Sequence, residues 1–380
     1  MNGLFQVEEL RSKSGAKIKV IGVGGGGCNM INHMISENVS GIDLVVANTD
    51  AQALDSSLAP TKIQLGAKMT RGLGAGMKPE VGRGAAEESY QEIKSMLEGA
   101  DMVFVAAGMG GGTGTGAAEV VAAAAKEVGA LTVAVVTKPF IFEGQKRRKF
   151  ADEGLAGVKK VCDSIVVIPN DKLLAIVDKN MGIKDSFKIV DNVLSRAVTG
   201  ISGVILKHGD NDINLDFADL KTVMSHKGTA LMGVGEASGN DAAYQAVKNA
   251  IESPLFDNIS ISGAMGVLVH VNMHPNYPLV QIQQAMSIVY ESADPDADVI
   301  FGTTTDESIE NDRVVITIVA TGFEKEAANG FAPKQQLDKD SQIEQERVQV
   351  RAIRKISGGY DITFDEDELQ VPTYLRRQMD

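Results

Sequence analysis

The chain has 380 residues, of which 44% are hydrophobic, and a formal net charge of −13 at neutral pH. This length allows two ordinary domains with packed cores, and no apolar run approaches the length that spans a bilayer. The acidic balance argues against nonspecific nucleic-acid binding and against electrostatic attachment to anionic lipid. Two cysteines provide no disulfide framework, and the first ten residues do not resemble a signal peptide, so we expect a cytosolic protein.

Strands and helices alternate in the first half of the chain. Strands are predicted at 17–23, 42–47, 101–107, 131–137 and 164–169, and helices at 81–97 and 117–128. This alternation predicts a parallel sheet that is covered by helices on both faces. A ligand is then expected at the carboxyl ends of the strands.

Two glycine-rich turns each connect a predicted strand to a predicted helix. Gly24–Gly27 precedes a helix that we expect to open at Cys28, and Gly108–Gly116 contains six glycines and two threonines before an alanine-rich helix. Glycines leave the backbone open to a ligand, and peptide N–H groups at a helix N-terminus form an anion site. The two turns therefore predict phosphate binding.

The first turn also fits a dinucleotide site. Gly22, Gly24 and Gly27 satisfy G-x-G-x-x-G, and Asp50 follows the next strand at a suitable spacing for the ribose. A dinucleotide has a single pyrophosphate and needs a single such turn, whereas two turns favour a triphosphate held from two sides. Neither turn is a Walker A motif, because no Gly-Lys-Ser/Thr follows it.

The second half of the chain begins with one long predicted helix, 185–208. Apolar residues recur along it at helical spacing, while two glycines weaken its middle. A second α/β unit follows, with strands predicted at 229–234, 266–272, 298–303 and 314–319 and helices at 241–251 and 279–291. After Gly322 the composition becomes polar, which predicts a linker without a core.

Several ordered segments together resemble the tubulin/FtsZ family of GTPases, and within it the bacterial FtsZ branch, over nearly the whole chain. These segments are Gly22-Val-Gly-Gly-Gly-Gly-Cys-Asn29, Ala47-Asn-Thr-Asp-Ala-Gln-Ala-Leu54, Gly72-Leu-Gly-Ala-Gly76, Gly110-Gly-Gly-Thr-Gly-Thr-Gly116, Val136-Thr-Lys-Pro-Phe140, Ile168-Pro-Asn-Asp-Lys-Leu173, Asn214-Leu-Asp-Phe-Ala-Asp219 and the tail peptide Leu369–Gln378. The resemblance implies a parallel-sheet GTP-binding domain that a long central helix joins to a smaller α/β domain.

The domain boundaries that follow are a disordered N-terminal segment at 1–14, the GTP-binding domain at 15–183, the central helix at 184–209, the GTPase-activating domain at 210–323, a flexible linker at 324–365 and a partner-binding peptide at 366–380.

The resemblance also implies a set of GTP-binding residues: Gly25, Gly26, Gly27, Cys28, Asn29, Gly112, Thr113, Gly114, Glu143, Arg147, Asn170, Phe187 and Asp191. The chemistry of these residue types is suitable. A carboxylate at Asp191 can accept hydrogen bonds from guanine, and Asn192 is its rival by one position. Phe187 can stack on the base or pack in the core, and Glu143 and Arg147 can bind ribose and phosphate or form a solvated helix face.

Cys28 replaces a glycine that is frequent in the family's first turn. A thiol near a helix N-terminus is expected to be somewhat acidic, and a cysteine is tolerated there if its φ is negative. We expect no catalytic role for it and no protein-held metal site.

Asp216 and Asp219 lie three residues apart at a predicted helix start. They can cap that helix, or they can orient or deprotonate the water that attacks a γ-phosphate. The resemblance favours catalysis, because the family places this segment against the nucleotide of the next subunit.

The resemblance further implies head-to-tail filaments, a contractile division ring in the cytoplasm at midcell, hydrolysis of GTP to GDP with Mg²⁺ held mainly by phosphates and water, and a tail peptide that binds membrane tethers and division regulators. Two alternatives stay open. One is a nucleotide-dependent oxidoreductase that does not polymerise, and the other is a structural relative that does not hydrolyse GTP.

Overall fold

The computed structural model describes residues 15–174, 181–206, 213, 216–226, 228–256 and 261–323. The predicted segments 1–14, 324–365 and 366–380 lie outside the described residues. The strands are β1 (Ile18–Val23), β2 (Ile42–Asn48), β3 (Thr61–Gln64), β4 (Met102–Gly108), β5 (Leu131–Lys138), β6 (Ser164–Pro169), β7 (Thr229–Ser238), β8 (Gly266–Met273), β9 (Asp298–Thr305) and β10 (Arg313–Thr321).

The helices connect these strands. They are α1 (Gly24–Ser36), α2 (Ala51–Asp55), α3 (Ala67–Thr70), α4 (Pro79–Glu88), α5 (Tyr90–Leu97), α6 (Thr113–Glu127), α7 (Gln145–Val161), α8 (Asn170–Leu173), α9 (Ile183–Leu206), α10 (Phe217–Met224), α11 (Ala242–Ile251) and α12 (Leu279–Ser292). Short 3₁₀ turns occur at Ile141–Glu143, Pro254–Phe256 and Ile261–Gly263.

The strands form one sheet in the order β3-β2-β1-β4-β5-β6-β7-β10-β8-β9. The first six strands are parallel, which confirms the predicted parallel sheet. β7 joins β6 through two residue pairs only, and then pairs antiparallel with β10. The narrow β6–β7 seam therefore marks the point where the second α/β unit begins.

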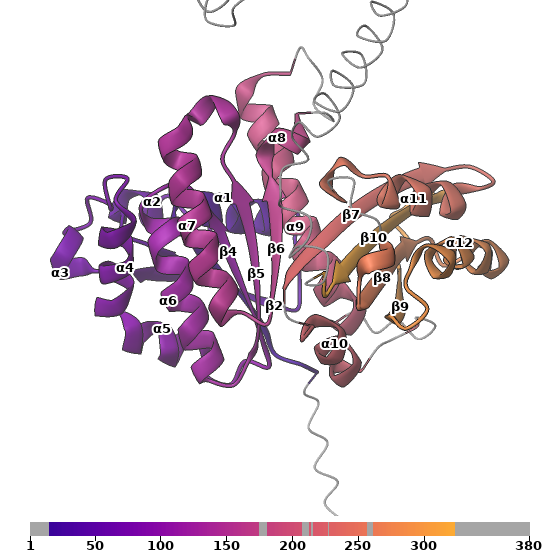
Figure 1. The fold of residues 1–380 in the computed structure, drawn as a ribbon, viewed down its shortest axis with the longest axis horizontal. Helices are drawn as coiled ribbons and strands as arrows, with labels where there is room; N and C mark the ends of the chain where they lie inside the picture. Colours follow the sequence, from indigo (N-terminus) through magenta and orange to yellow (C-terminus); the bar gives the residue numbers. More distant parts are fainter. Residues whose placement is uncertain are drawn as a thin grey trace, which may run out of the picture. The chain divides into compact units, whose positions relative to one another are not determined.

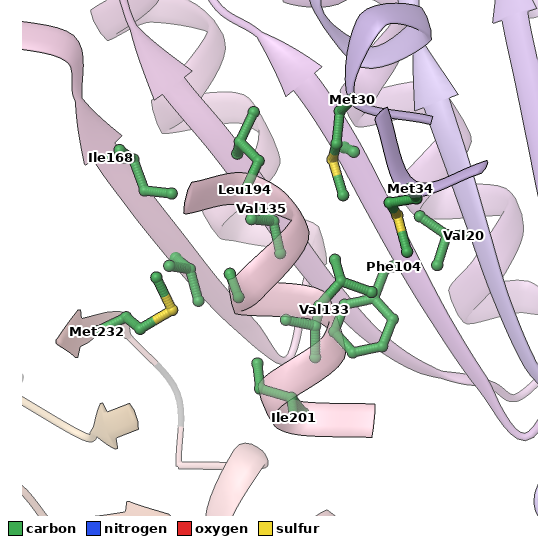
Figure 2. Packing of buried hydrophobic residues seen from close by; sticks show 14 of the residues in the cluster. Val20, Met30, Met34, Phe104, Val133, Val135, Ile168, Leu194, Ile201 and Met232 are labelled. Carbon is green, nitrogen blue, oxygen red and sulfur yellow. The ribbon is translucent and has the colours of Figure 1, made fainter. Parts of the chain in front are cut away.

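Helices cover both faces of the parallel strands (Figure 1). On one face, α1 and α9 bury a cluster that includes Met30, Phe104 and Leu194. Figure 2 shows Leu194 and Ile201 of α9 among the strand residues Phe104, Val133 and Val135 of this cluster. A second cluster lies on the other face under α4 to α7, and a third lies between the C-terminal strands and the helices α11 and α12.

Some element boundaries differ from the predictions. The helix predicted over 81–97 is two helices, because the chain bends at Ser89, where φ is −97° and ψ is 14°. Helix α1 begins at Gly24 rather than Cys28, so the glycines form its first turn. The four-residue edge strand β3 was not predicted, because it is too short for a periodic signal.

The long helix α9 runs antiparallel to the parallel strands. Near its start, the Phe187 ring lies 5.5 Å from the ring of Phe140, which follows the carboxyl end of β5. At its other end, Leu206 Cδ1 lies 3.7 Å from the Cβ position of Gly41, just before the start of β2. With 24 residues, α9 spans about 36 Å from one end of the sheet to the other.

By length and composition alone, Lys184–Leu206 of α9 could cross a membrane, but 67% of its most apolar window is buried inside the protein. The glycines expected to weaken the helix have a packing reason. A Cβ on Gly200 would lie 2.7 Å from Thr317 Cγ2, and one on Gly203 would lie 3.2 Å from His270 Cε1. These two glycines let α9 lie directly against the C-terminal strands.

Candidate nucleotide site

The two glycine turns meet at the point where the connections of the sheet diverge. β1 and β4 are neighbours, but α1 leads to β2 on one side and α6 leads to β5 on the other. A crevice outside the carboxyl ends of the strands at such a point is where α/β proteins bind ligands. The sheet order thus brings together two turns that are far apart in the sequence.

The backbones of the two turns are in direct contact. A Cβ on Gly24 would lie 2.7 Å from the amide nitrogen of Gly114, and one on Gly26 would lie 3.1 Å from Gly108 Cα. Gly24 also has a φ of +70°, which L side chains rarely adopt. Several of the glycines are therefore required by the fold of the empty site, independently of any ligand.

Two other glycines have a different environment. A Cβ on Gly25 or Gly111 would meet no atom within 4 Å. In contrast, a Cβ on Gly112 would lie 2.8 Å from Ala75 Cβ and 3.0 Å from the Lys78 nitrogen. Gly25 and Gly111 are thus the positions where a ligand can touch the backbone, whereas Gly112 packs against the segment before α4.

The segment 66–78 forms a third wall of the site. Thr70 Oγ1 donates to the Thr49 carbonyl at 3.2 Å, and the hydroxyls of Thr49 and Thr113 are 2.7 Å apart. Gly72, Gly74 and the other glycines of this segment have positive φ values, as do Arg71 and Met77. The motif Gly72–Gly76 supported the family resemblance, but no residue in it was assigned to the site from the sequence.

The N-termini of three helices converge here. α1 and α6 begin at the two glycine turns, and α4 packs so closely on α6 that a Cβ on Gly116 would overlap the Pro79 carbonyl oxygen. Helix N-termini present unpaired N–H groups and a partial positive charge. Three of them close together favour an anion such as phosphate.

Asp50, which a dinucleotide site would direct to a ribose, has another function in this fold. Its Oδ1 accepts hydrogen bonds from the Gln52 and Ala53 amides at 2.9 and 3.2 Å, so it caps α2. The Asp50 carboxylate is therefore engaged within its own chain, which argues against the dinucleotide alternative.

Glu143 and Arg147 form one ion pair beside the second glycine turn. Arg147 Nη1 lies 2.7 Å from Glu143 Oε2, while Glu143 Oε1 accepts from the Phe140 amide at 3.0 Å. The backbone of Arg147 also lies against the turn, since a Cβ on Gly110 would be 2.9 Å from the Arg147 carbonyl oxygen. Both side chains are therefore at the site, with the carboxylate fixed by two partners.

Two polar side chains that lack partners in the described part of the chain lie just after β6 and in the first half of α9. Asn170 is 5% exposed, and its buried Oδ1 receives no hydrogen bond from any described residue. Burial raises the pKa of Asp191 to about 6, and its carboxylate has no ion-pair or hydrogen-bond partner among the described residues. Its neighbour Asn192 instead bonds Glu37 of α1, at 3.2 Å. Asp191 is thus the acceptor left available to a ligand.

Phe187 and Asn29 are two further members of the predicted GTP-binding set. Phe187 is 41% exposed and meets Phe140 edge to face, so it is not a core residue. Asn29 is exposed in the second turn of α1.

Cys28 corrects one expectation. Its φ is negative, which is why a side chain is tolerated there, but burial raises the pKa of its thiol to about 11. The side chain belongs to the core under α1 and lies 3.7 Å from Asn48 Nδ2. Desolvation outweighs the helix N-terminus, so the thiol is not acidic.

Asp216 and Asp219 lie away from the glycine turns. Both are exposed, and the Asp216 side chain makes no capping hydrogen bond to α10. Ile213, three residues earlier, lies beside Val204 in the last turn of α9, since both contact the Cβ position of Gly302. Val204 is 17 residues from Phe187, or about 26 Å along the helix axis. In Figure 1, α8 and α10 likewise lie at opposite ends of β6.

A groove of about 600 Å³ lies at the amino ends of β1, β2 and β3, where Lys19, Ile42 and Thr61 line it. It is at the end of these strands opposite the glycine turns, so it is not the nucleotide site. Among the residues that the structure describes, no cluster of three or more His, Cys, Asp or Glu side chains could hold a metal ion.

The fold and the paired glycine turns define a nucleotide-binding protein of the tubulin-like GTPase class. Residues 17–178 match the Tubulin/FtsZ family GTPase domain, and residues 228–324 match the FtsZ family C-terminal domain. The chain is similar to an empty FtsZ dimer structure from M. jannaschii, with 46% identity over 83% of this chain and 90% of that chain and a TM-score of 0.78. It also shares its fold with CetZ2 from Haloferax volcanii, described as a GTPγS-bound protofilament, at 20% identity over 89% and 99% of the two chains and a TM-score of 0.69.

The two family matches cover both α/β units. The chain therefore belongs to the FtsZ family and is a GTPase.

Proposed function

We propose that the chain polymerises head to tail into protofilaments, and that each GTP is hydrolysed between two subunits. One subunit holds GTP at its glycine turns, and Asp216 and Asp219 of the adjacent subunit complete the catalytic site. The filaments form the contractile division ring in the cytoplasm at midcell, and GTP hydrolysis drives filament turnover.

The observation that supports this proposal is the separation of the two halves of the site. The glycine turns lie at the carboxyl ends of the parallel strands, and α9 leads away from them for its whole length before Asp216 is reached. Asp216 and Asp219 are exposed carboxylates, the Asp216 side chain makes no capping hydrogen bond, and both residues lie away from the glycine turns of their own chain. They can act on a triphosphate when a second copy brings them to it.

A contact between two different ends of the same protein does not close into a dimer when it repeats by translation. It produces a filament instead. The M. jannaschii relative is described as a dimer, which is consistent with self-association in this family, although that description concerns the relative.

We further propose how the nucleotide is read. The phosphates lie on the amides around Gly25–Gly27 and Gly112–Gly114, with Cys28 shaping the turn from the core side and Thr113 as a hydroxyl donor. At the base, Asp191 and Asn170 bond guanine, Asn29 assists, and Phe187 covers the ring. The Glu143–Arg147 pair then lies between the phosphate end and the base end of the site, close enough to contact ribose and phosphate oxygens.

Magnesium fits this site in one way. The described residues contain no carboxylate cluster that would bind it alone, whereas the hydroxyls of Thr49 and Thr113 line the phosphate end. Mg²⁺ commonly retains several waters and uses substrate phosphates as ligands. It would therefore arrive with GTP and neutralise phosphate charge there.

The peptide 366–380 is proposed to bind membrane tethers and division regulators. It joins apolar and basic residues behind an acidic run, and Pro372 can start a short helix whose Tyr374 and Leu375 dock in a partner's groove. The linker 324–365 would let the filament stay attached at a distance.

Mixing experiments with Asp216→Ala test the shared site. The variant should bind GTP like the wild type, because the changed residue belongs to the other half of the site, but its GTP turnover should be lost. Added to wild type at increasing ratios, it should lower the turnover per wild-type subunit, since mixed contacts lack the carboxylate. Asp241→Ala is a matched control, because Asp241 also precedes a helix without a side-chain capping bond.

A constant turnover per wild-type subunit at every mixing ratio would show that each subunit hydrolyses GTP by itself. If turnover per wild-type subunit stays constant while light scattering shows normal polymerisation, the filament proposal stands and only the shared catalytic site is wrong.

A further inference from the structure

The phosphate end of the site raises a question of charge. A nucleoside triphosphate is polyanionic, and neither glycine turn is followed by the lysine of a Walker A motif. Four basic side chains around the turns already have carboxylate partners. These pairs are Arg147–Glu143, Arg83–Glu119, Arg148–Asp171 and Lys138–Asp152. A cation without such a partner would be available to the phosphates.

Lys78 is such a cation, and its position is defined by the second glycine turn. Its backbone nitrogen and oxygen lie 3.0 and 3.3 Å from the Cβ position of Gly112. It occupies the N-cap position of α4, where its backbone is extended and its side chain makes no capping bond. The residue is exposed, and among the described residues its ammonium group has neither an ion pair nor a hydrogen bond.

Gly111 also indicates that the space beside the second glycine turn is open to a ligand. Gly111, adjacent to Gly112, is one of the two glycines whose Cβ would enter open space. A lysine has a flexible four-carbon stem and three donors, so its charge can follow a phosphate that lies on this turn. The N-termini of α4 and α6 flank the same space and favour an anion there.

We propose that Lys78 is a phosphate-binding residue that contacts the terminal phosphate of GTP and favours GTP over GDP. This inference rests on the proposed placement of the phosphates at the glycine turns. A charge-assisted contact to the third phosphate is absent in GDP, so it discriminates between substrate and product. It also offsets the repulsion between the triphosphate and the carboxylates that an adjacent subunit would bring.

Arg71 is the nearest rival in the same segment. It too is exposed and has no partner among the described residues, but it lies toward the sheet edge. A Cβ on Gly72, the next residue, would lie 2.9 Å from Ala51 Cβ, at the start of α2 just after β2, and 3.5 Å from Gln64 Nε2, at the end of β3. In the sheet, β2 and β3 are two and three strand spacings away from β4, or about 10 and 14 Å. Lys78, beside the turn that follows β4, is therefore the better placed cation.

The experiment compares equilibrium affinities for GTPγS and GDP in the full chain, at protein concentrations below assembly and in excess Mg²⁺. Lys78→Gln should weaken GTPγS binding about tenfold and change GDP binding less than about twofold, because a contact to a charged group is lost only in the triphosphate complex. Lys78→Arg should restore most of the affinity. Arg71→Gln removes the same charge from the same segment and should leave both affinities within about twofold.

Equal losses for GTPγS and GDP, no loss in Lys78→Gln, or the larger loss in Arg71→Gln would each overturn the inference. Gly111→Ser separates this failure from failure of the proposed site. If Gly111→Ser loses both nucleotides while Lys78→Gln binds normally, the phosphates lie on the turns and Lys78 does not contact them. If Gly111→Ser binds both nucleotides normally, the placement of the phosphates itself is wrong.

Discussion

Replacing Asp191 by asparagine should make the nucleotide-free protein more stable. The carboxylate is largely buried without a partner among the described residues, and burial raises its pKa to about 6 from an ordinary value of 3.8. Keeping this carboxylate ionised at pH 8 therefore costs the folded state up to about 3 kcal/mol, since each pKa unit corresponds to about 1.4 kcal/mol. Because part of the carboxylate is exposed to water, we expect Asp191→Asn to gain about 1–3 kcal/mol.

The pH dependence identifies the cause. The folded protein holds this proton more tightly than the unfolded chain does, so the wild type loses stability from this group as the pH rises from about 4 to about 6. The cost is constant above that range and absent below it. The advantage of Asp191→Asn should therefore be complete at pH 8 and should fall to about a third of that value at pH 4.5.

Urea titrations of the nucleotide-free wild type and variant at the two pH values measure this difference. Asp185→Asn is the control, because Asp185 is an exposed aspartate on the same helix that pairs with Lys188. A variant no more stable than wild type at pH 8, or equally stabilised at both pH values, would refute the argument from buried charge. GTP affinity measured on the same samples should fall about tenfold or more, since guanine loses an acceptor.

Two further predictions concern the glycine turn and the tail. Gly111→Ser should keep the melting temperature of the nucleotide-free protein and lower its GTP affinity at least tenfold, whereas Gly112→Ser should lower both quantities, because its side chain meets Ala75 in the empty site. Thermal unfolding and equilibrium binding measure the two quantities. A stable Gly111→Ser variant with normal GTP affinity would contradict this prediction. Deletion of 366–380 should spare GTPase activity and polymerisation in solution but abolish recruitment to membrane-bound tethers, which fluorescence microscopy of dividing cells can follow. Rings of the truncated protein at the division site would refute this.

The sequence predicts the parallel sheet well because both of its faces are buried. Runs such as Met102–Ala107 are continuously apolar, which only a strand covered on both sides requires. Periodicity carries no information about which strands pair, however. The β1–β4 neighbourhood, which brings the two glycine turns together, is a property of the three-dimensional structure alone.

The same limit applies to the site. The sequence contains the glycines but does not distinguish their tasks: Gly24 avoids another backbone, while Gly111 faces open space. It assigns Asp191 to the base but keeps Asn192 as a rival by one position, and only the packing of α9 on α1 shows that Asn192 is engaged by Glu37. The break at Ser89 has no clear local signal, since good helix formers surround it.

The central helix connects these observations to assembly. α9 is buried against α1 and the parallel strands at one end and lies on the C-terminal strands through Gly200 and Gly203 at the other. A buried helix of fixed length holds the two proposed half-sites, one near Phe187 and one near Asp216, at a constant separation along one axis. In the proposed filament, the α9 axis determines the direction in which subunits stack, since each subunit must bring Asp216 and Asp219 close to the nucleotide of the adjacent subunit. A substitution that displaces α9 from the C-terminal strands would then lower turnover without touching either half-site, and nucleotide affinity would not report it.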